Sequence, residues 1–143
     1  MTYQQDQRGK AIKLLADSQF FRGAAPTDLE RILDGAFERR VPKGAFFFQQ
    51  GDPAENLYLL RKGGIKLTQL SADGEQIILR YVGPGQMFGG IAMLGETIYP
   101  ASAEASEAST ALVWHGDMMR QVMIDVPTVA LNALEHLAKR VQD

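Results

Sequence analysis

The sequence has no cysteine among its 143 residues, which excludes disulfides, thiolate-held iron–sulfur clusters and a cysteine nucleophile. It also lacks any apolar run approaching the roughly 20 residues that a membrane-spanning helix needs. Neither sign of charge dominates, because 15 Lys and Arg stand against 17 Asp and Glu. No basic stripe therefore indicates that these residues bind DNA themselves. These absences favour a cytoplasmic protein without a membrane partner, and a hydrophobic content of 45% is enough for a core.

Groups that could carry catalysis are scarce. The sequence has only 2 His, His115 and His136, whereas a cupin-type metal site needs two or three His and a Glu that converge from neighbouring strands. No Ser-His-Asp order, phosphate loop or pair of catalytic carboxylates is apparent, and Glu104 and Glu107 flank a strand end as solvated side chains. We therefore expect no enzyme activity and no metal site.

Helical patterns at both ends enclose a β-rich middle. Short apolar stretches are separated by Gly, Pro and Asp-Gly turn signals, a spacing typical of a jelly roll or barrel. The expected helices lie near 11–15, from 26, from 117 and from 127, and the expected strands at 45–49, 57–60, 65–70, 77–82, 102–105 and 110–114. Turns that favour glycine are expected at Gly44, Gly51, Gly64, Gly74 and Gly85. The predicted fold is mainly β, a double-stranded β-helix (jelly roll) with flanking helices.

Residues 88–105, FGGIAMLGETIYPASAEA, have the order of a phosphate-binding cassette: a glycine turn, a short apolar helix, a loop and a strand. We call this segment the cassette. Backbone N–H groups at a helix start can hold an anion. A cyclic nucleotide also needs a cation for its phosphate and an acceptor for its ribose hydroxyl, and the cassette has neither in the expected places.

The chain resembles the sensor domain of the Crp/Fnr family of bacterial transcription regulators. The resemblance covers roughly residues 10–143, and its motifs are PKG at 42–44, QGDPAENLYLL at 50–60, KGGIKL at 62–67, ADGE at 72–75, GPGQMFG at 83–89, IAML at 91–94 and ASAEA at 101–105. It implies a cyclic-nucleotide-binding-like sensor domain over residues 1–125 and the start of a long dimerisation helix over 126–143. It also implies that DNA is bound by a helix-turn-helix domain that this chain does not contain, so we expect a module cut from a longer protein.

The apolar stripe of the last helix has spacings of three and four residues. Such a stripe can pack on a partner helix, and the resemblance implies a homodimer through it. The expected interface residues are Ala130, Leu134, Leu137 and Val141.

In relatives that bind cyclic AMP, the cassette reads FGE…R[ST]A. Counted along this chain, Gly90 replaces the Glu, Tyr99 the Arg and Pro100 the Ser or Thr. Each lost charge-assisted hydrogen bond is worth about 1.5–3 kcal/mol, so we expect the effector to be something other than cyclic AMP. A true cyclic-nucleotide-binding module remains an alternative. Carried over by position, the ligand-binding residues are Phe88, Gly89, Gly90, Ile91, Ala92, Met93, Tyr99, Pro100, Ala101 and Ser102.

The pattern Tyr-x-Ala-[Ser/Thr]-Ala at 99–103 is closer to the denitrification-regulator branch, whose members are similar to haem-dependent nitric oxide sensors. This likeness implies non-covalent haem in an apolar pocket between the roll and the long helix, with His136, or less readily His115, as axial ligand. The simpler interpretations are a solvent or helix-interface His136 and a loop His115. Tyr99 can face a pocket or the surface. Five methionines can line a cofactor pocket, although core packing is more usual: Met87, Met93, Met118, Met119 and Met123.

The resemblance implies a two-state switch. A small-molecule or gas effector binds between residues 91–94 and the last helix, and it changes how the paired helices pack. The alternative is a roll that binds nothing and only dimerises.

Overall fold

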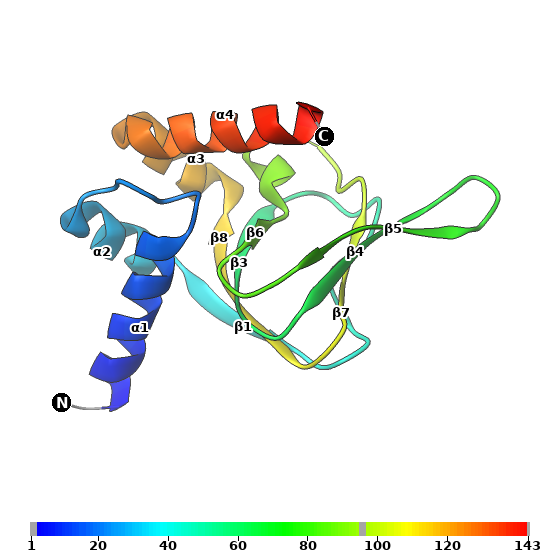
Figure 1. The fold of residues 1–143 in the computed structure, drawn as a ribbon, viewed down its shortest axis with the longest axis horizontal. Coiled ribbons are helices and arrows are strands. Elements are labelled where there is room, and N and C mark those ends of the chain that lie inside the picture. Colours follow the sequence, from blue (N-terminus) through cyan, green and yellow to red (C-terminus); the bar gives the residue numbers. More distant parts are fainter. Residues whose placement is uncertain (1–2, 95–96, 143) are drawn as a thin grey trace. The chain divides into compact units, whose positions relative to one another are not determined.

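The computed structural model describes residues 3–94 and 97–142. The chain forms two compact units. Residues 37–117 form one unit, which we call the roll, and residues up to 36 and from 118 onward form the other, which we call the helical unit. The elements of both are drawn in Figure 1.

The roll is built from two antiparallel four-stranded sheets, as the predicted jelly roll requires. One has the order β1-β8-β3-β6 and the other β2-β7-β4-β5. Only the β4–β5 pair joins strands that are consecutive in the chain. All other pairs join strands that are distant in sequence, as is typical of a jelly roll. The strands are β1 (Phe37–Val41), β2 (Phe46–Phe48), β3 (Asn56–Lys62), β4 (Ile65–Leu70), β5 (Gln76–Val82), β6 (Met87–Phe88), β7 (Ser102–Ala105) and β8 (Ser109–His115).

Aromatic rings from several strands fill the core of the roll. Tyr58 and Leu60 of β3 belong to its core, and the ring of Tyr58 stacks on Phe88 with centroids 4.9 Å apart. Phe47 packs edge-on against both rings, 5.4 Å from each. Large buried rings contribute much of the hydrophobic stabilisation of a small domain, so the FFF strand predicted at 45–49 carries the centre of this core.

Two strands, β1 and β6, were not predicted from the sequence. In β1, four of five residues are exposed and only Val41 is buried, so no apolar alternation marks it. Its pairing with β8, from Phe37 opposite Val113 to Val41 opposite Ser109, rests on backbone hydrogen bonds. Strand β6 has two residues, too few to show a period.

The turn between β3 and β4 corrects one expectation. Gly63 has the positive φ, +97°, and Gly64 does not. The other four expected glycines, Gly44, Gly51, Gly74 and Gly85, do have positive φ. In the KGG turn, Gly63 is the residue that comes closest to the β8 strand, and the backbone has no room there for a side chain.

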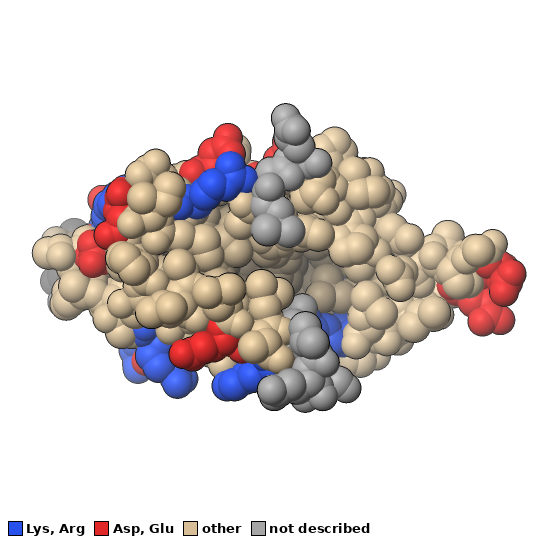
Figure 2. All heavy atoms as spheres, turned by 90° about the horizontal axis from the view of Figure 1, so that it is seen from above, with Lys and Arg blue, Asp and Glu red and all other residues tan. Residues whose placement is uncertain are grey.

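The β4–β5 hairpin is the most exposed part of the roll. Acidic side chains gather at its tip (Figure 2), where the sequence reads ADGE at 72–75. Its stem is apolar and exposed, with Leu70, Ile77, Ile78, Leu79 and Tyr81 between 46% and 65% accessible. Strand β5 also forms the edge of its sheet, and the exposure of these side chains shows that the residues the structure describes leave the outer face of the hairpin uncovered.

The helical unit contains α1 (Tyr3–Asp17), α2 (Pro26–Asp34), most of α3 (Gly116–Asp125) and α4 (Pro127–Gln142). Helix α2 begins at Pro26, as predicted, and α1 is longer than the expected 11–15 because polar residues continue its first turns. Phe20 and Phe21 are buried and contact each other edge-to-face at 5.1 Å. Asn132 of α4 donates to the carbonyls of Phe20 and Arg22 at 3.0 and 2.8 Å, which ties α4 to the segment between α1 and α2.

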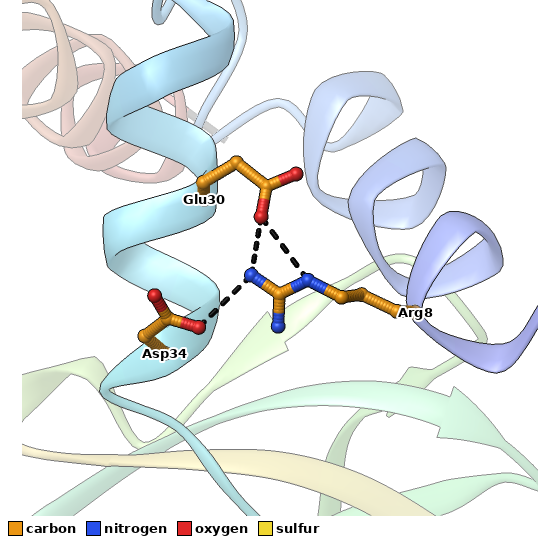
Figure 3. Close-up of polar contacts among 3 residues, drawn as sticks. All are labelled: Arg8, Glu30 and Asp34. Atoms are coloured by element: carbon orange, nitrogen blue, oxygen red, sulfur yellow. Dashed lines mark hydrogen bonds and ion pairs between the residues drawn. The ribbon is translucent and has the colours of Figure 1, made fainter. Parts of the chain in front are cut away.

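An exposed ion cluster joins α1 to α2 (Figure 3). Arg8 donates to Glu30 and to Asp34, the latter at 2.9 Å. The hydrogen bonds that Arg8 donates to Glu30, and then to Asp34, raise the pKa of the Arg8 guanidinium above its usual value. Because these groups are solvated, the cluster adds little to the stability of the helical unit.

Helix α4 has a buried face and an exposed apolar face. Val129 and Ala133 are buried, whereas Leu131, Leu134 and Leu137 are 57–62% exposed. Among the predicted interface residues, Ala130 is half-buried and the side chain of Val141 lies outside the described residues. No helix within the described ranges is long and apolar enough to span a membrane.

Candidate functional site in the cassette of the roll

The cassette follows β6 and returns to the sheet through β7. Its expected apolar helix is a single 3₁₀ segment, η1 (Gly90–Leu94). Residues 95 and 96 lie outside the described residues. Beyond them, Thr97 accepts from the N–H of Ala54 at 2.9 Å and Tyr99 exchanges backbone bonds with Gly51 and Asp52. The loop at 97–99 is therefore fixed to the segment that precedes β3.

The glycine turn of the cassette lies directly on the aromatic core. Gly89 has φ +75°, and a Cβ there would come within 3.0 Å of the Tyr58 ring and 3.2 Å of the Phe48 ring. A Cβ at Gly90 would lie 3.7 Å from the Met93 side chain, an ordinary contact. Gly89 is thus required by the packing, whereas a Cβ is accommodated at Gly90.

Tyr99 lies where the resemblance to cyclic-AMP-binding relatives led us to expect a cation. Its ring is buried, 3% exposed, and it stacks on Phe48 with centroids 3.7 Å apart. Its hydroxyl donates to the carbonyl of Asn56 and accepts from the N–H of the same residue at 3.2 Å. The alternatives left open by the sequence are thereby decided: Tyr99 faces inward, and its hydroxyl binds the β3 backbone.

The environment of Tyr99 also changes its acidity. Burial is the main cause that raises the pKa of the Tyr99 phenol well above its usual value of 10.0, and the charge of Tyr58 adds to it. A buried phenol resists ionisation because the phenolate loses hydration.

A pH dependence follows from this raised pKa. The folded chain binds the Tyr99 proton more tightly than the unfolded chain does, so this contribution to stability is complete below about pH 10 and falls as the pH rises above it. We expect urea unfolding at about pH 8 and about pH 11 to show a smaller loss of stability in Tyr99→Phe than in the parent chain. Equal losses would mean that Tyr99 titrates normally in the fold.

The remaining predicted positions are divided between core and surface. Phe88, Ala92 and Ala101 are buried, Ile91 and Met93 are half-buried, and Pro100 is exposed. Two glutamines that the sequence did not single out hold this part of the loop. Gln69 donates to the carbonyl of Pro100 at 3.0 Å, and the N–H of Gln50 donates to Ser102 Oγ at 2.8 Å. The hydroxyl of Ser102 thus accepts a hydrogen bond from the backbone of the loop before β3.

The sequence also gave no signal for Arg80 of β5. This arginine is half-buried and lies opposite Leu67, which packs against the core of the roll. Its Nη2 donates to the carbonyl of Met87 at 3.0 Å, immediately before Phe88 begins the cassette.

The histidines lie in different units. His115 ends β8 in the roll and is exposed, with its ring 5.6 Å from that of Phe37. His136 lies on α4 and is half-buried. Among the described residues no group of three or more His, Asp or Glu could hold a metal ion. Each unit thus offers a haem at most one imidazole, and ligation by His136 stays a prediction. Of the five methionines, Met119 is buried and the others are half-buried, consistent with core packing.

Comparison with known proteins identifies the family. The profile of the cyclic nucleotide-binding domain matches residues 38–125, more than half of the chain. The cyclic AMP receptor protein of Thermus thermophilus is 32% identical over 126 residues, which are 88% of this chain and 58% of that protein. The acetyltransferase Pat of Mycolicibacterium smegmatis is 32% identical over 103 residues, 72% of this chain and 30% of that enzyme.

The structure gives the same result. The sensor domain of the transcriptional regulator DNR from Pseudomonas aeruginosa superposes with a TM-score of 0.83 at 27% identity, covering 99% of this chain and 92% of that one. The chain spans little more than half the length of the receptor protein, and that part is the sensor-like part. The chain therefore belongs to the cyclic nucleotide-binding domain family, within the Crp/Fnr group of bacterial transcription regulators.

Proposed function

We propose that this chain is the effector-sensing module of a Crp/Fnr-type transcription regulator, and that its effector is not cyclic AMP. The observation that carries the proposal is the placement of Tyr99: at the position where the resemblance implies a cation, the chain has a buried ring whose hydroxyl is bonded to β3. The module itself performs no catalysis, and DNA is bound by a further domain of a longer cytoplasmic protein. The acetyltransferase Pat also contains a segment similar to this module, and that segment is 30% of the enzyme.

Calorimetry with cyclic AMP tests the choice of effector. Loss of the ribose acceptor and of the phosphate cation should weaken binding by roughly 10² to 10⁴, so we expect no saturable heat at micromolar nucleotide. Saturable binding in that range would overturn the proposal and restore the alternative of a true cyclic-nucleotide-binding module.

Haem is the second candidate effector group, favoured by the Tyr99–Ala103 pattern and the close superposition on the DNR sensor domain. Here His136 would hold the iron, and haem would supply the gas-binding site. Titration with haemin should then give a saturable Soret shift that His136→Ala abolishes and His115→Ala retains. An unchanged shift in His136→Ala would exclude this histidine as ligand.

We propose further that two copies of the chain pair through α4 and that effector binding changes this pairing. The support is the apolar face of α4 that its own unit leaves exposed, with Leu134 at 62% and Leu137 at 57%. Apolar side chains at spacings of three and four are typical of helix–helix seams.

The double substitution Leu134→Asp with Leu137→Asp should convert the dimer to a monomer, because four carboxylates would face one another across the seam. The measurement is the molar mass by sedimentation equilibrium. Ile124→Asp is the matched control, since Ile124 is 67% exposed on α3 and should leave the mass of a dimer unchanged. A parent chain that is monomeric at all concentrations, or a double variant that remains a dimer, would contradict this proposal.

A further inference from the structure

We infer that the roll binds an uncharged, planar compound bearing an amide at the end of its inner face, where Asn56 of β3 lies beside His115 of β8. The Asn56 carboxamide pairs with the amide of the ligand, and the rings of His115 and Phe37 offer its plane a surface to stack on. This inference rests on the proposed effector-sensing function and names the chemistry of the effector.

The register of the sheet brings Asn56 and His115 together. They are directly opposite each other in the antiparallel pair of β3 and β8, and the N–H and carbonyl of Asn56 are both bonded to the Tyr99 hydroxyl. Those backbone groups therefore point away from β8, so the two residues form a pair without ladder hydrogen bonds. In such a pair the Cα atoms are about 4.5 Å apart and the side chains share one face.

That face is the inner one, at the point where it reaches the surface. Tyr58 and Val113 are the next opposite pair on the same face, and both belong to the core of the roll. Asn56 is half-buried and His115 is exposed. Phe37 of β1 is also opposite Val113, and its ring is 43% exposed and 5.6 Å from the ring of His115. An amide and two rings are thus gathered at one accessible end of the roll.

The Asn56 side chain has an unused hydrogen-bonding atom. Its Oδ1 is buried, and no described residue donates to it. Buried polar atoms of folded proteins nearly always have a partner, because an unpaired one loses its hydration without compensation. Residues that break this rule are expected at functional sites, and a ligand N–H would supply the missing donor.

The chemistry of the site favours an amide. A carboxamide has one acceptor, two donors and no charge, so another amide matches it with both kinds of group in one plane. Aromatic side chains add offset stacked contacts to a planar ligand. Asn56 and Phe37 together therefore select a planar compound that carries an amide.

The site also lies next to the cassette. Gly116 directly follows His115, and a Cβ on Gly116 would come within 2.3 Å of the carbonyl oxygen of Ala92 in η1. On the other side, Asn56 is bonded to the Tyr99 hydroxyl. A ligand held by Asn56 and His115 therefore touches residues that are in contact with both η1 and Tyr99, which is how its binding would reach the cassette.

Thermal unfolding with two small amides tests the inference. Nicotinamide, a ring with a primary amide, or α-pyridone, a cyclic amide, should raise Tm at about 5 mM, since a ligand of the native state stabilises it. In Asn56→Leu most of that rise should disappear, as expected for about a tenfold loss of affinity when a buried hydrogen-bond partner is removed. Pyridine, which has the ring but no amide, should give little or no rise. A rise with nicotinamide alone indicates a primary amide, and a rise with α-pyridone alone a cyclic one.

The same variant reports on the unpaired oxygen without any probe. Leu is close to Asn in size and has no polar side-chain atom, so Asn56→Leu should melt at or above the Tm of the parent chain. Asn132→Leu is the matched control, because the Asn132 amide donates to the carbonyls of Phe20 and Arg22. Its Tm should fall, while the rise with the amide probe should persist.

Four results would overturn the inference. They are no rise in the parent chain with either amide, an equal rise in Asn56→Leu, an equal rise with pyridine, and a lower Tm of Asn56→Leu without probe. The last would show that Oδ1 has a structural partner, such as a buried water. Each of them would leave the proposed function standing, since that depends on the dimer mass and the cyclic AMP titration.

Discussion

Gly63→Ala should destabilise the roll by about 2–5 kcal/mol. This is more than the same change should cost at a turn glycine that has free space around it. Gly63 has φ +97°, and an L-residue in the left-handed region costs about 1–2 kcal/mol. A Cβ there would also lie 2.6 Å from the carbonyl oxygen of Ala108 and 2.7 Å from Ser109 Cα. Both are backbone atoms of the segment that starts β8, so relief needs a backbone shift, and overpacking of this kind costs about 1–3 kcal/mol.

Gly74→Ala separates the two causes. Gly74 turns the β4–β5 hairpin with φ +83°, and nothing lies within 4 Å of a Cβ built on it. Its substitution should therefore cost only the backbone term, about 1–2 kcal/mol. Urea unfolding of both variants beside the parent chain measures the difference. Equal losses would show that the approach of Gly63 to β8 imposes no steric cost.

The Gly63 turn illustrates what the sequence could and could not specify. The KGG motif marked a turn between two apolar strands, and β4 was predicted with its observed bounds, 65–70, as was β7 at 102–105. Gly63, which takes the positive φ, lies against Ser109, a residue 46 positions further along the chain, and the hydroxyl of Ser109 is hydrogen-bonded to the backbone of Gly64. Local pattern carries no information about that contact.

The same limit applies to the strands and to the site. Strand β1 was missed because FERRV is mostly exposed and is held by pairing with β8. The alternation of apolar residues along the sequence gives no sign of such backbone pairing. In the cassette, the absence of an acid at Gly90 and of a cation at Tyr99 was readable from the sequence. The contacts of Tyr99 with Phe48 and Asn56, and the approach of Arg80 to Met87, join residues 7 to 51 positions apart in the chain. They depend on the register of the roll, which the sequence pattern did not fix.

Tyr99→Ala should cost about 3–5 kcal/mol, the usual range for removing a large buried aromatic side chain. The ring is 3% exposed and stacks on Phe48 at 3.7 Å, so its loss leaves a cavity against the centre of the aromatic core. Tyr99→Phe keeps the ring and removes only the hydroxyl that binds the Asn56 backbone. It should cost about 1–3 kcal/mol, the range for groups left without a partner in the interior.

Tyr81→Ala is the control for these two variants. Tyr81 is 65% exposed on β5, and surface substitutions of this kind change stability by about 0.5 kcal/mol or less. Urea unfolding at neutral pH should rank the losses as Tyr99→Ala, then Tyr99→Phe, then Tyr81→Ala. If Tyr99→Ala unfolds like the control, the ring does not pack as the structure shows.

The ranking also bears on the effector. If the Tyr99 ring stabilises the roll this strongly, Tyr99→Arg would remove the stacked ring and place a charge beside Phe48, so it should unfold the domain more readily rather than create a phosphate site. A stable Tyr99→Arg variant that binds cyclic AMP at micromolar concentration would instead show that the roll retains the nucleotide pocket and that Tyr99 merely closes it. In this chain position 99 makes a core contact, where the resemblance to relatives that bind cyclic AMP implies a ligand contact.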